Sequence, residues 1–251
     1  MKILAITQAR YGSTRLPAKI LKEVNGKTLL ELHLERILQS KMISKLKVAT
    51  TTEDGAEYIV NISKKLNVET YQGSINDVLE RFYFAAKDEQ PDYVVRLTSD
   101  CPLIDPVVID KLISSCLESG CDYASNTLSP TYPDGVDVEV FKFRALEKAY
   151  KEAVLKSDRE HVTPYIWRNS TFKGQSLFKS INVENEVDLS HHRITVDTIE
   201  DFLLIKGLIE ALGTDKPFTA YIDYLENHPR LKDINNQHAR NEGYDKSILK
   251  D

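Results

Sequence analysis

Short apolar runs alternate with stretches of helical periodicity along most of this chain. The runs 2–7, 45–51 and 93–97 are rich in β-branched and aliphatic residues, whereas residues 29–40 repeat their leucines and isoleucines at helical spacing. Strands that alternate with helices favour a largely parallel sheet covered by helices. We therefore predict an α/β fold, a single three-layer domain over residues 1–251 with a mainly parallel mixed sheet.

Turn and cap residues predict the details of this alternation. Asn25-Gly26 between short apolar stretches predicts a hairpin. Asp105 before Pro106 is typical of a helix start, and residues 157–160 have the pattern of a capping box. These segments should therefore lie at the ends of strands and helices.

The alternation of strands and helices ends near residue 213. We expect the core to cover residues 1–213 and a helical appendage to cover residues 214–251. Residues 235–251 are mostly polar, and we expect them to be partly disordered or packed on a partner subunit.

The first apolar run leads into a basic loop. Residues 1–22 contain five Lys and Arg residues and no acid, although the formal net charge of the chain is -5. Arg10, Arg15 and Lys19 can donate charge-assisted hydrogen bonds to phosphate oxygens. We predict a triphosphate site here; a solvated basic turn is the alternative.

Small and hydroxyl residues complete the interpretation of this loop. Gly12 permits a positive φ, and Ser13 and Thr14 add hydroxyl donors. The loop contains neither a Walker A motif nor a dinucleotide fingerprint. The nucleotide-binding residues predicted from it are Gln8, Ala9, Arg10, Gly12, Ser13, Arg15 and Lys19.

Residues 6–19, Ile-Thr-Gln-Ala-Arg-Tyr-Gly-Ser-Thr-Arg-Leu-Pro-Ala-Lys, resemble the signature loop of the sugar-activating cytidylyltransferases. That family includes the 3-deoxy-manno-octulosonate and acylneuraminate enzymes. The resemblance is closest to the subfamily labelled spore-coat polysaccharide biosynthesis cytidylyltransferase-like, in which a glycine commonly stands where this chain has Ala18. It implies a nucleotide-diphospho-sugar transferase-like, that is Rossmann-like, fold.

A second stretch, residues 71–82, resembles the second nucleotide motif of the same family. Gly73 would let the backbone approach cytosine or ribose, with Ser74, Asp77 and Arg81 nearby. The spacing alone also fits a capped helix start with a surface pair between Asp77 and Arg81. Both interpretations stay open from the residues alone.

Two aspartates are the predicted metal ligands. Asp100 follows the run 93–97, at the edge where open α/β sheets bind ligands. Asp197 follows the run 191–196, which we predict to be a strand, and a helix cap is the alternative role for it. The corresponding aspartates of the family bind magnesium, so the resemblance assigns Mg²⁺ to Asp100 and Asp197.

An acidic segment provides the candidate contacts of the second substrate. Residues 135–141 alternate, which predicts a strand with Asp137 and Glu139 on one face. Asp134, Asp137 or Glu139 could meet sugar hydroxyls, and a solvated strand face is the alternative. Arg193 could meet an acceptor carboxylate.

Three histidines receive no role at this point. His161 could contact substrate, although a histidine on a helix is more often a packing or surface residue. His191 and His192 lack the spacing and the partners of a metal site.

The resemblance implies a Mg²⁺-dependent cytidylyltransferase of cell-surface polysaccharide biosynthesis. An acidic sugar of the nonulosonic or 3-deoxy-octulosonic type would attack CTP, giving a CMP-sugar and pyrophosphate. The expected catalytic residues are Arg10, Arg15, Lys19 and Asp100. A glycosyltransferase that uses a nucleotide-sugar donor and a non-catalytic nucleotide-binding partner are the alternatives.

Composition indicates the setting. Three cysteines without metal-ligand spacing favour a reduced cytoplasmic environment. No run of apolar residues is long enough for a signal peptide or a membrane span. The slightly acidic charge argues against a nucleic-acid partner. We expect a cytoplasmic homodimer.

Overall fold

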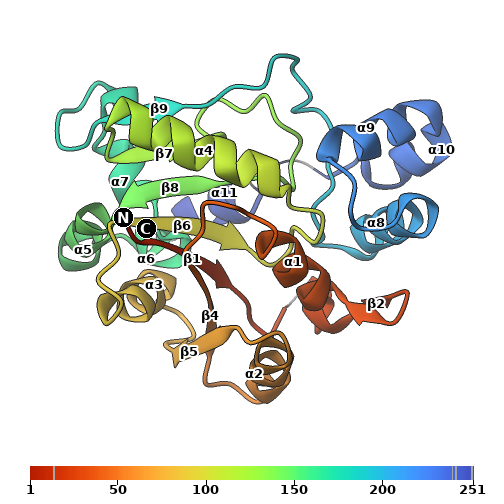
Figure 1. The fold of residues 1–251 in the computed structure, drawn as a ribbon, viewed down its shortest axis with the longest axis horizontal. Helices are drawn as coiled ribbons and strands as arrows, with labels where there is room; N and C mark the ends of the chain where they lie inside the picture. Colours follow the sequence, from red (N-terminus) through yellow and green to blue (C-terminus); the bar gives the residue numbers. More distant parts are fainter. Residues whose placement is uncertain (14, 239, 241, 250) are drawn as a thin grey trace.

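The computed structural model describes residues 1–13, 15–238, 240, 242–249 and 251. A seven-stranded sheet of order β5-β4-β1-β6-β8-β7-β9 forms its centre (Figure 1). The strands are β1 (Ile3–Gln8), β4 (Lys45–Thr51), β5 (Glu69–Gly73), β6 (Tyr93–Thr98), β7 (Tyr123–Ser125), β8 (Glu139–Lys142) and β9 (Ser180–Asn182). β8 runs antiparallel to both of its neighbours, and the other pairs are parallel. The predicted mainly parallel mixed sheet is confirmed.

Helices cover both faces of the sheet because its strands are apolar on both sides. In β1, Ile3 and Ala5 join one hydrophobic core, whereas Leu4 and Ile6 join the other. The first core is closed by α1 (Leu29–Ile37), α2 (Ala56–Lys65), α4 (Pro106–Ser119), α8 (Ile199–Leu212) and α9 (Phe218–Asn227). The second is closed by α3 (Val78–Lys87), α5 (Phe143–Glu152) and α7 (Pro164–Arg168). This gives three layers.

Shorter elements complete the fold. They are the hairpin of β2 (Glu23–Val24) and β3 (Lys27–Thr28), the helices α6 (Lys156–His161), α10 (Pro229–Lys232) and α11 (Glu242–Ile248), and the 3₁₀ turns η1 (Lys19–Leu21), η2 (Thr171–Lys173) and η3 (Asp233–Asn235). None of the helices among the described residues has the length and apolar character needed to cross a bilayer.

Several local predictions are confirmed. Asn25 and Gly26 form the turn of the β2–β3 hairpin, with φ values of 51° and 76°. The Asp105 side chain accepts a hydrogen bond from the Val107 N–H at 2.8 Å and caps α4, which ends at Gly120. The sequence predicted this turn and this helix cap correctly because each depends on only a few neighbouring residues.

Three local predictions are wrong. No capping box opens α6, because the Ser157 backbone N–H and hydroxyl bind Asp251 instead. The segment 191–196 is no strand and makes only an isolated bridge between Arg193 and Asp134. β8 begins at Glu139 rather than at residue 135.

The C-terminal residues pack on their own chain. In Figure 1, α11 lies near the middle of the sheet, away from α9 and α10, and it packs against α6. Its Ser247 is buried, with 3% exposure. The expectation of disorder is therefore wrong for the described part of residues 235–251, whereas contact with a partner subunit stays a prediction.

Candidate active site

Two adjoining cavities lie at the carboxyl edge of the parallel strands. The first, of about 880 Å³, is lined by seven Lys and Arg and three Asp and Glu among the described residues, and we call it the basic cavity. The second, of about 530 Å³, is lined by four Lys and Arg and seven Asp and Glu among the same residues, and we call it the acidic cavity. The residues that line both are Gln8, Arg15, Thr98, Asp100, His161, Asp197 and Gly243.

The N-terminal loop supplies one wall of the basic cavity. β1 ends at Gln8, and the backbone N–H of Ala9 still donates to Ala49 at 3.2 Å, so the loop leaves the sheet at a fixed point. The predicted residues that line the cavity are Gln8, Ala9, Arg10, Ser13, Arg15 and Lys19. Thr14 lies outside the described residues.

Gly12 differs from the prediction. It does not line the cavity, its φ is not positive, and its N–H donates to Glu53 at 3.1 Å. The left-handed residue of the loop is instead Ala18, with a φ of 50°. The sequence-based reason given for Gly12 is therefore wrong, and the strained position is the one at which the resembling subfamily commonly has glycine.

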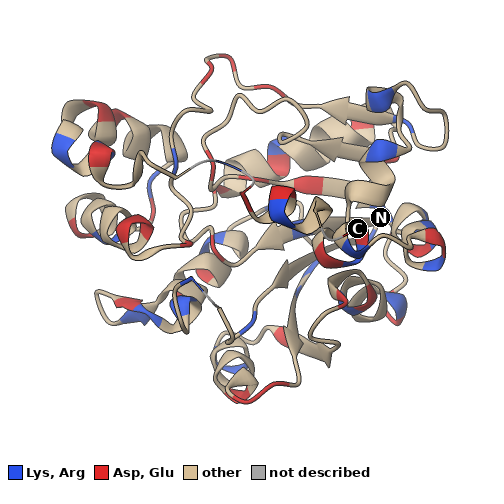
Figure 2. Ribbon diagram, turned by 180° about the vertical axis from the view of Figure 1, so that it is seen from behind, with Lys and Arg blue, Asp and Glu red and all other residues tan. Residues whose placement is uncertain are grey.

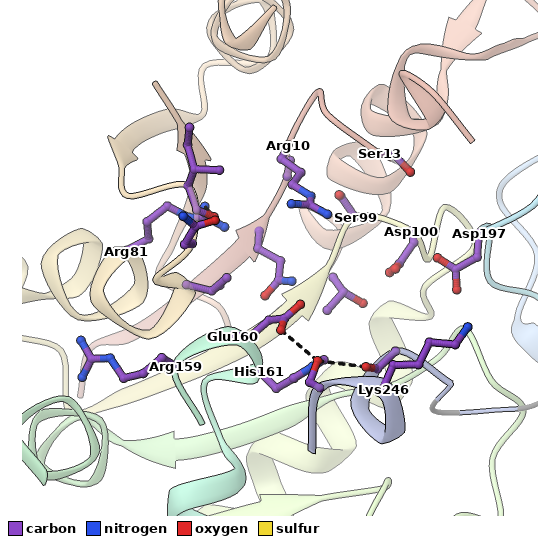
Figure 3. Close-up of a pocket in the computed structure, with 18 of the residues that line it drawn as sticks. Arg10, Ser13, Arg81, Ser99, Asp100, Arg159, Glu160, His161, Asp197 and Lys246 are labelled. Carbon is purple, nitrogen blue, oxygen red and sulfur yellow. Dashed lines mark hydrogen bonds between the residues drawn. The ribbon is translucent and has the colours of Figure 1, made fainter. Parts of the chain in front are cut away.

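Asp100 and Asp197 converge on one ammonium group. Lys19 Nζ lies 3.4 Å from Asp100 Oδ2 and 2.8 Å from Asp197 Oδ1, and Arg15 Nη2 lies 2.9 Å from the same Asp197 oxygen. Figure 3 shows the two aspartates side by side at the edge of the cavity. Residues 97 positions apart in the chain thus form a single carboxylate pair.

These carboxylates are suited to a cation. Burial would raise the pKa of Asp100, but the Lys19 ammonium and hydrogen bonds hold it at about 2. Burial would likewise lower the pKa of Lys19, but Asp100 and Asp197 raise it. The pair is ionised and already holds one cation, and carboxylate oxygens are the ligands that Mg²⁺ prefers.

Backbone bonds between two loops position this pair. The Val196 N–H donates to the Asp100 carbonyl at 2.8 Å, and Thr195 Oγ1 donates to the same oxygen at 3.0 Å. Thr198, not Asp197, caps α8. Asp197 therefore reaches the edge without ending a strand, and its side chain is not used as the cap.

The second motif lines the basic cavity, but of the four residues predicted from it only Arg81 does so; the other lining residues of this motif are Ile75, Asn76 and Val78. Arg81 lines the cavity and is 2% exposed, and its Nη1 donates to the Ser74 carbonyl at 2.7 Å. Asp77 caps α3 and pairs with Arg159 rather than with Arg81. Gly73, Ser74 and Asp77 are not among the lining residues. Burial lowers the pKa of Arg81 to about 10, and the guanidinium stays charged.

The three predicted acceptor-binding acids line the acidic cavity, and each is paired with an arginine. Asp134 Oδ2 lies 2.6 Å from Arg193 Nη1, Asp137 pairs with Arg240, and Glu139 pairs with Arg96. Glu139 also accepts hydrogen bonds from Tyr123 and Thr163, so both of its oxygens are occupied.

Arg193 lines the acidic cavity, but its donors are committed. In addition to Asp134, it reaches Asp201 at 2.9 Å and Asp197 at 3.1 Å. Burial would lower the pKa of Arg193, but Asp201 and the other carboxylates raise it. Within this structure Arg193 therefore holds Asp197 in place.

Sequence reasoning missed the walls made by α6 and α11. Lys156, Arg159, Glu160 and His161 of α6, and Gly243, Lys246 and Ser247 of α11, line the basic cavity. His161 lines both cavities, so its place is compatible with the substrate contact that the sequence left open beside a packing or surface role. No local signal marks these residues, because α6 and α11 meet across more than 80 positions of the chain.

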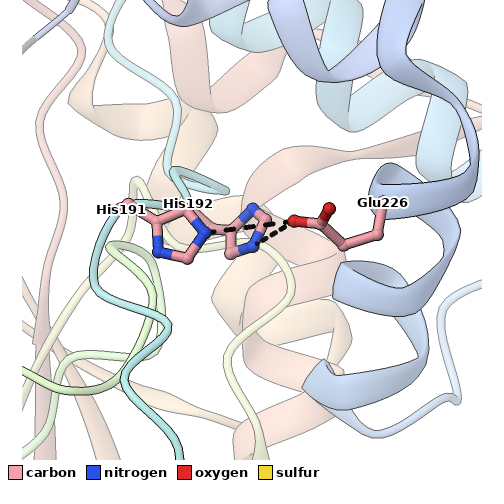
Figure 4. A group of neighbouring side chains, drawn as sticks. All are labelled: His191, His192 and Glu226. Atoms are coloured by element: carbon pink, nitrogen blue, oxygen red, sulfur yellow. Dashed lines mark ion pairs between the residues drawn. The ribbon is translucent and has the colours of Figure 1, made fainter.

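The fold also gives the adjacent histidines a partner. His191 and His192 place Nε2 atoms 3.9 and 2.9 Å from Glu226 Oε1, and the three ligand atoms lie within 4.8 Å of one another (Figure 4). The sequence-based statement that they lack a partner is therefore wrong. The Lys232 ammonium already contacts Glu226 Oε1 at 2.8 Å, and we therefore assign no metal to these three residues.

Comparisons with known proteins give matches that cover most of the chain. A family model described as cytidylyltransferase matches residues 4–237. An uncharacterised protein of Methanocaldococcus jannaschii is 40% identical over 94% of this chain and 95% of its own length. The spore coat polysaccharide biosynthesis protein SpsF of Bacillus subtilis is 30% identical over 84% and 88%. A solved cytidylyltransferase structure from Leptospira borgpetersenii serovar Hardjo-bovis gives a TM-score of 0.86 at 36% identity, covering 92% of this chain and 97% of that one.

Proposed function

This chain belongs to the cytidylyltransferase family, and from that premise we propose that it activates an acidic sugar with CTP. The acceptor would be of the nonulosonic or 3-deoxy-octulosonic type, and the products a CMP-sugar for cell-surface polysaccharide biosynthesis and pyrophosphate. The observation that carries this proposal is the convergence of Asp100 and Asp197 on Lys19, beside Arg15, where the two cavities meet.

The basic cavity would hold CTP. Its excess of cations suits a triphosphate, because Arg10, Arg15 and Lys19 can neutralise charge on the phosphate oxygens. Arg81 fixes the backbone at residues 74–75, whose peptide groups would read the edge of the cytosine. Ser13 offers a further hydroxyl donor.

Asp100 and Asp197 would hold Mg²⁺. The Lys19 ammonium between them supports this assignment, since it occupies a position where a cation is already stabilised by both carboxylates. When bound, Mg²⁺ would neutralise charge on the phosphates and orient them.

An acceptor hydroxyl in the acidic cavity would attack the α-phosphorus. The new bond between the hydroxyl oxygen and phosphorus forms as the bond to the bridging oxygen of pyrophosphate breaks. Gln8 and Arg15 line both cavities and so lie where the two substrates would meet. The contribution of the protein would be positioning and charge neutralisation.

Pyrophosphate release tests the proposal. Purified protein is assayed with ATP, GTP, CTP or UTP, each combined with 3-deoxy-manno-octulosonate, N-acetylneuraminate or glucose. We expect release with CTP and an acidic sugar, and its loss when EDTA removes divalent cations. Equal release with all four nucleotides would contradict the nucleotide assignment. Turnover of a nucleotide-sugar donor without pyrophosphate release would indicate the glycosyltransferase alternative.

We also propose that the enzyme works in the cytoplasm as a homodimer and that residues 1–251 form one domain. The cytoplasmic setting is supported by Cys101, Cys116 and Cys121, which are free and buried. The sulfurs of Cys116 and Cys121 lie 3.4 Å apart without a disulfide, as suits a reducing compartment. Light scattering after size-exclusion chromatography tests the dimer.

A further inference from the structure

The acidic cavity has an aromatic wall that the reaction described above does not use. Trp167, Phe172 and Tyr244 line the cavity together with His161. The Tyr244 ring centroid lies 6.0 Å from that of Trp167 and 5.2 Å from that of His161, edge-on in both cases. Phe172 is 38% exposed. The wall thus presents apolar surface to the cavity.

Aromatic and acidic groups in one cavity fit a sugar. The C–H groups on one face of a sugar ring are apolar and pack well on aromatic side chains. Its hydroxyls are donors, and the oxygens of Asp134 and Asp137 are acceptors in the same cavity. A volume of about 530 Å³ is within the range of small-molecule sites.

Lys173 adds an available cation to this wall. Its Nζ lies 5.7 Å from the ring centroid of Trp167 and 5.2 Å from that of Phe172. Lys173 forms no ion pair with any residue that the structure describes. Lys173 can therefore pair with an incoming carboxylate without breaking an existing ion pair.

The other cations of the acidic cavity are already engaged. Arg96 pairs with Glu139, and Arg193 is held by three aspartates. Arg15 pairs with Asp197 at 2.9 Å. An acidic ligand that used one of these arginines would share it with a carboxylate of the protein, whereas Lys173 has no such competitor among the described residues.

Tyr244 is held in the wall by contacts between α11 and α6. Ser247 Oγ lies 2.8 Å from Glu160 Oε2 and 3.0 Å from His161 Nε2, and Figure 3 shows Glu160 and His161 facing this helix. The Ser157 N–H donates to Asp251 at 2.8 Å. The ring position is thus fixed by a helix that lies beyond the residues 4–237 matched by the family model.

We infer that Lys173 and the aromatic wall of Trp167, Phe172 and Tyr244 bind the sugar acid proposed above as the acceptor. Its ring lies on the aromatic side chains, and its carboxylate pairs with the Lys173 ammonium. This inference rests on the proposed function. The sequence suggested that Arg193 contacts the carboxylate of the acceptor, and we now assign this contact to Lys173.

Trp167 provides the measurement, because it is the only tryptophan of the chain. Its emission is followed while the protein, with CTP and EDTA present so that no turnover occurs, is titrated with N-acetylneuraminate, its methyl ester and 3-deoxy-manno-octulosonate. We expect a saturable change with at least one acid. For N-acetylneuraminate, the neutral ester should bind about tenfold more weakly than the acid, the scale of a hydrogen bond to a charged group.

Three variants separate the parts of the site. Lys173→Gln should weaken binding of the acid about tenfold and bring the acid and its ester to similar affinity. Tyr244→Ala should weaken acid and ester alike, and Tyr244→Phe should restore binding because it retains the ring. The matched controls are Lys151→Gln on α5 and Tyr224→Ala on α9, two residues outside both cavities.

The possible failures are distinguishable. If neither acid changes the Trp167 emission, or if Lys173→Gln leaves binding of the acid unchanged, the acceptor site is overturned. If Tyr244→Ala alters neither the emission of the free protein nor acid binding, the proposed place of Tyr244 in the aromatic wall is overturned. Calorimetric CTP affinity should stay within about twofold in every variant, since the sites are separate. A wild-type protein that binds no CTP would instead remove the proposed function.

Discussion

The basic and acidic cavities differ in how their charges are balanced. In the acidic cavity, Asp134, Asp137 and Glu139 each pair with an arginine. In the basic cavity, Arg10 lines the wall and forms no ion pair with any described residue. Figure 2 shows that segments of both charges surround this edge of the sheet. The three acids Asp134, Asp137 and Glu139 are thus paired within the protein, whereas Arg10 of the basic cavity is left for an anionic ligand.

This difference indicates what each cavity requires from its ligand. Paired carboxylates are held in fixed positions and can accept hydrogen bonds from hydroxyls without a large change in charge. An excess of cations raises the local concentration of a polyanion and is neutralised only when it binds. A substitution of a residue that lines only one cavity should therefore leave ligand binding in the other cavity unchanged.

The largest effect is expected where the cavities meet. Asp100→Asn and Asp197→Asn should each lower turnover by about 100-fold or more, because asparagine removes the charge that Mg²⁺ requires. Thermal stability should change little, since Thr198 rather than Asp197 caps α8. Pyrophosphate release and a thermal melt measure the two quantities. Asp223→Asn on α9 is the control, and near wild-type turnover of either variant at limiting Mg²⁺ would exclude the metal pair.

Changes in the basic loop should act on CTP alone. Arg15→Ala should weaken CTP binding by roughly 1.5–3 kcal/mol, which is about 10- to 150-fold, the scale of hydrogen bonds to charged groups. Lys19→Ala should do the same, although Lys19 is less exposed than the sequence suggested, with 15% side-chain exposure. Calorimetry gives the affinity. Lys22→Ala is the control, because Lys22 lies in the same segment but lines neither cavity. Unchanged affinity would remove the loop from the nucleotide site.

Asp137 should make the acidic cavity sensitive to pH. Burial raises its pKa to about 7, with Asp134 and Glu139 acting in the same direction and Arg240 opposing them. Asp137 is therefore mostly neutral below pH 7 and negative above it. The KM for a sugar acid should rise between pH 6 and pH 8, by a few-fold as expected for one nearby charge.

The matched variant is Asp137→Asn, which should flatten this rise and leave the CTP affinity unchanged. The KM for the acceptor and the calorimetric affinity for CTP are measured at each pH. A pH dependence that survives in Asp137→Asn would assign the effect to another group.

Local signals predicted those parts of the fold that depend on near neighbours. The strand β4 and the start of the helix α4 have the predicted positions, because periodicity and caps act within a few residues. Asp100 could be predicted as a site residue from its place after a central strand. Asp197 depended on the resemblance, since the segment before it is no strand.

Contacts between distant segments could not be predicted. Arg159 pairs with Asp77 across 82 positions, and Arg240 binds Asp137 across 103. No periodicity links such pairs, because they depend on the packing of the whole chain. The arginine partners of the acidic cavity, which determine its charge balance, therefore became visible only in the folded structure.

The smallest expected effect concerns backbone strain in the basic loop. Ala18 adopts a left-handed conformation, with φ 50° and ψ 34°, which is unfavourable for a residue with a Cβ by about 1 kcal/mol. Ala18→Gly should remove this strain, and the greater freedom of glycine in the unfolded chain offsets part of the gain. We expect the free energy of unfolding to rise by up to about 1 kcal/mol, measured by urea denaturation.

Gly120 has a left-handed backbone conformation like that of Ala18, and it allows the opposite substitution. Its φ is 62°, and an added Cβ would meet no atom within 4 Å, so Gly120→Ala tests the backbone term without a clash. It should lower the free energy of unfolding by about 1 kcal/mol. CTP affinity should remain unchanged in Ala18→Gly, because the side chains of Arg15 and Lys19 are retained. If Ala18→Gly were as destabilising as Gly120→Ala, the loop would not hold a left-handed residue at this position.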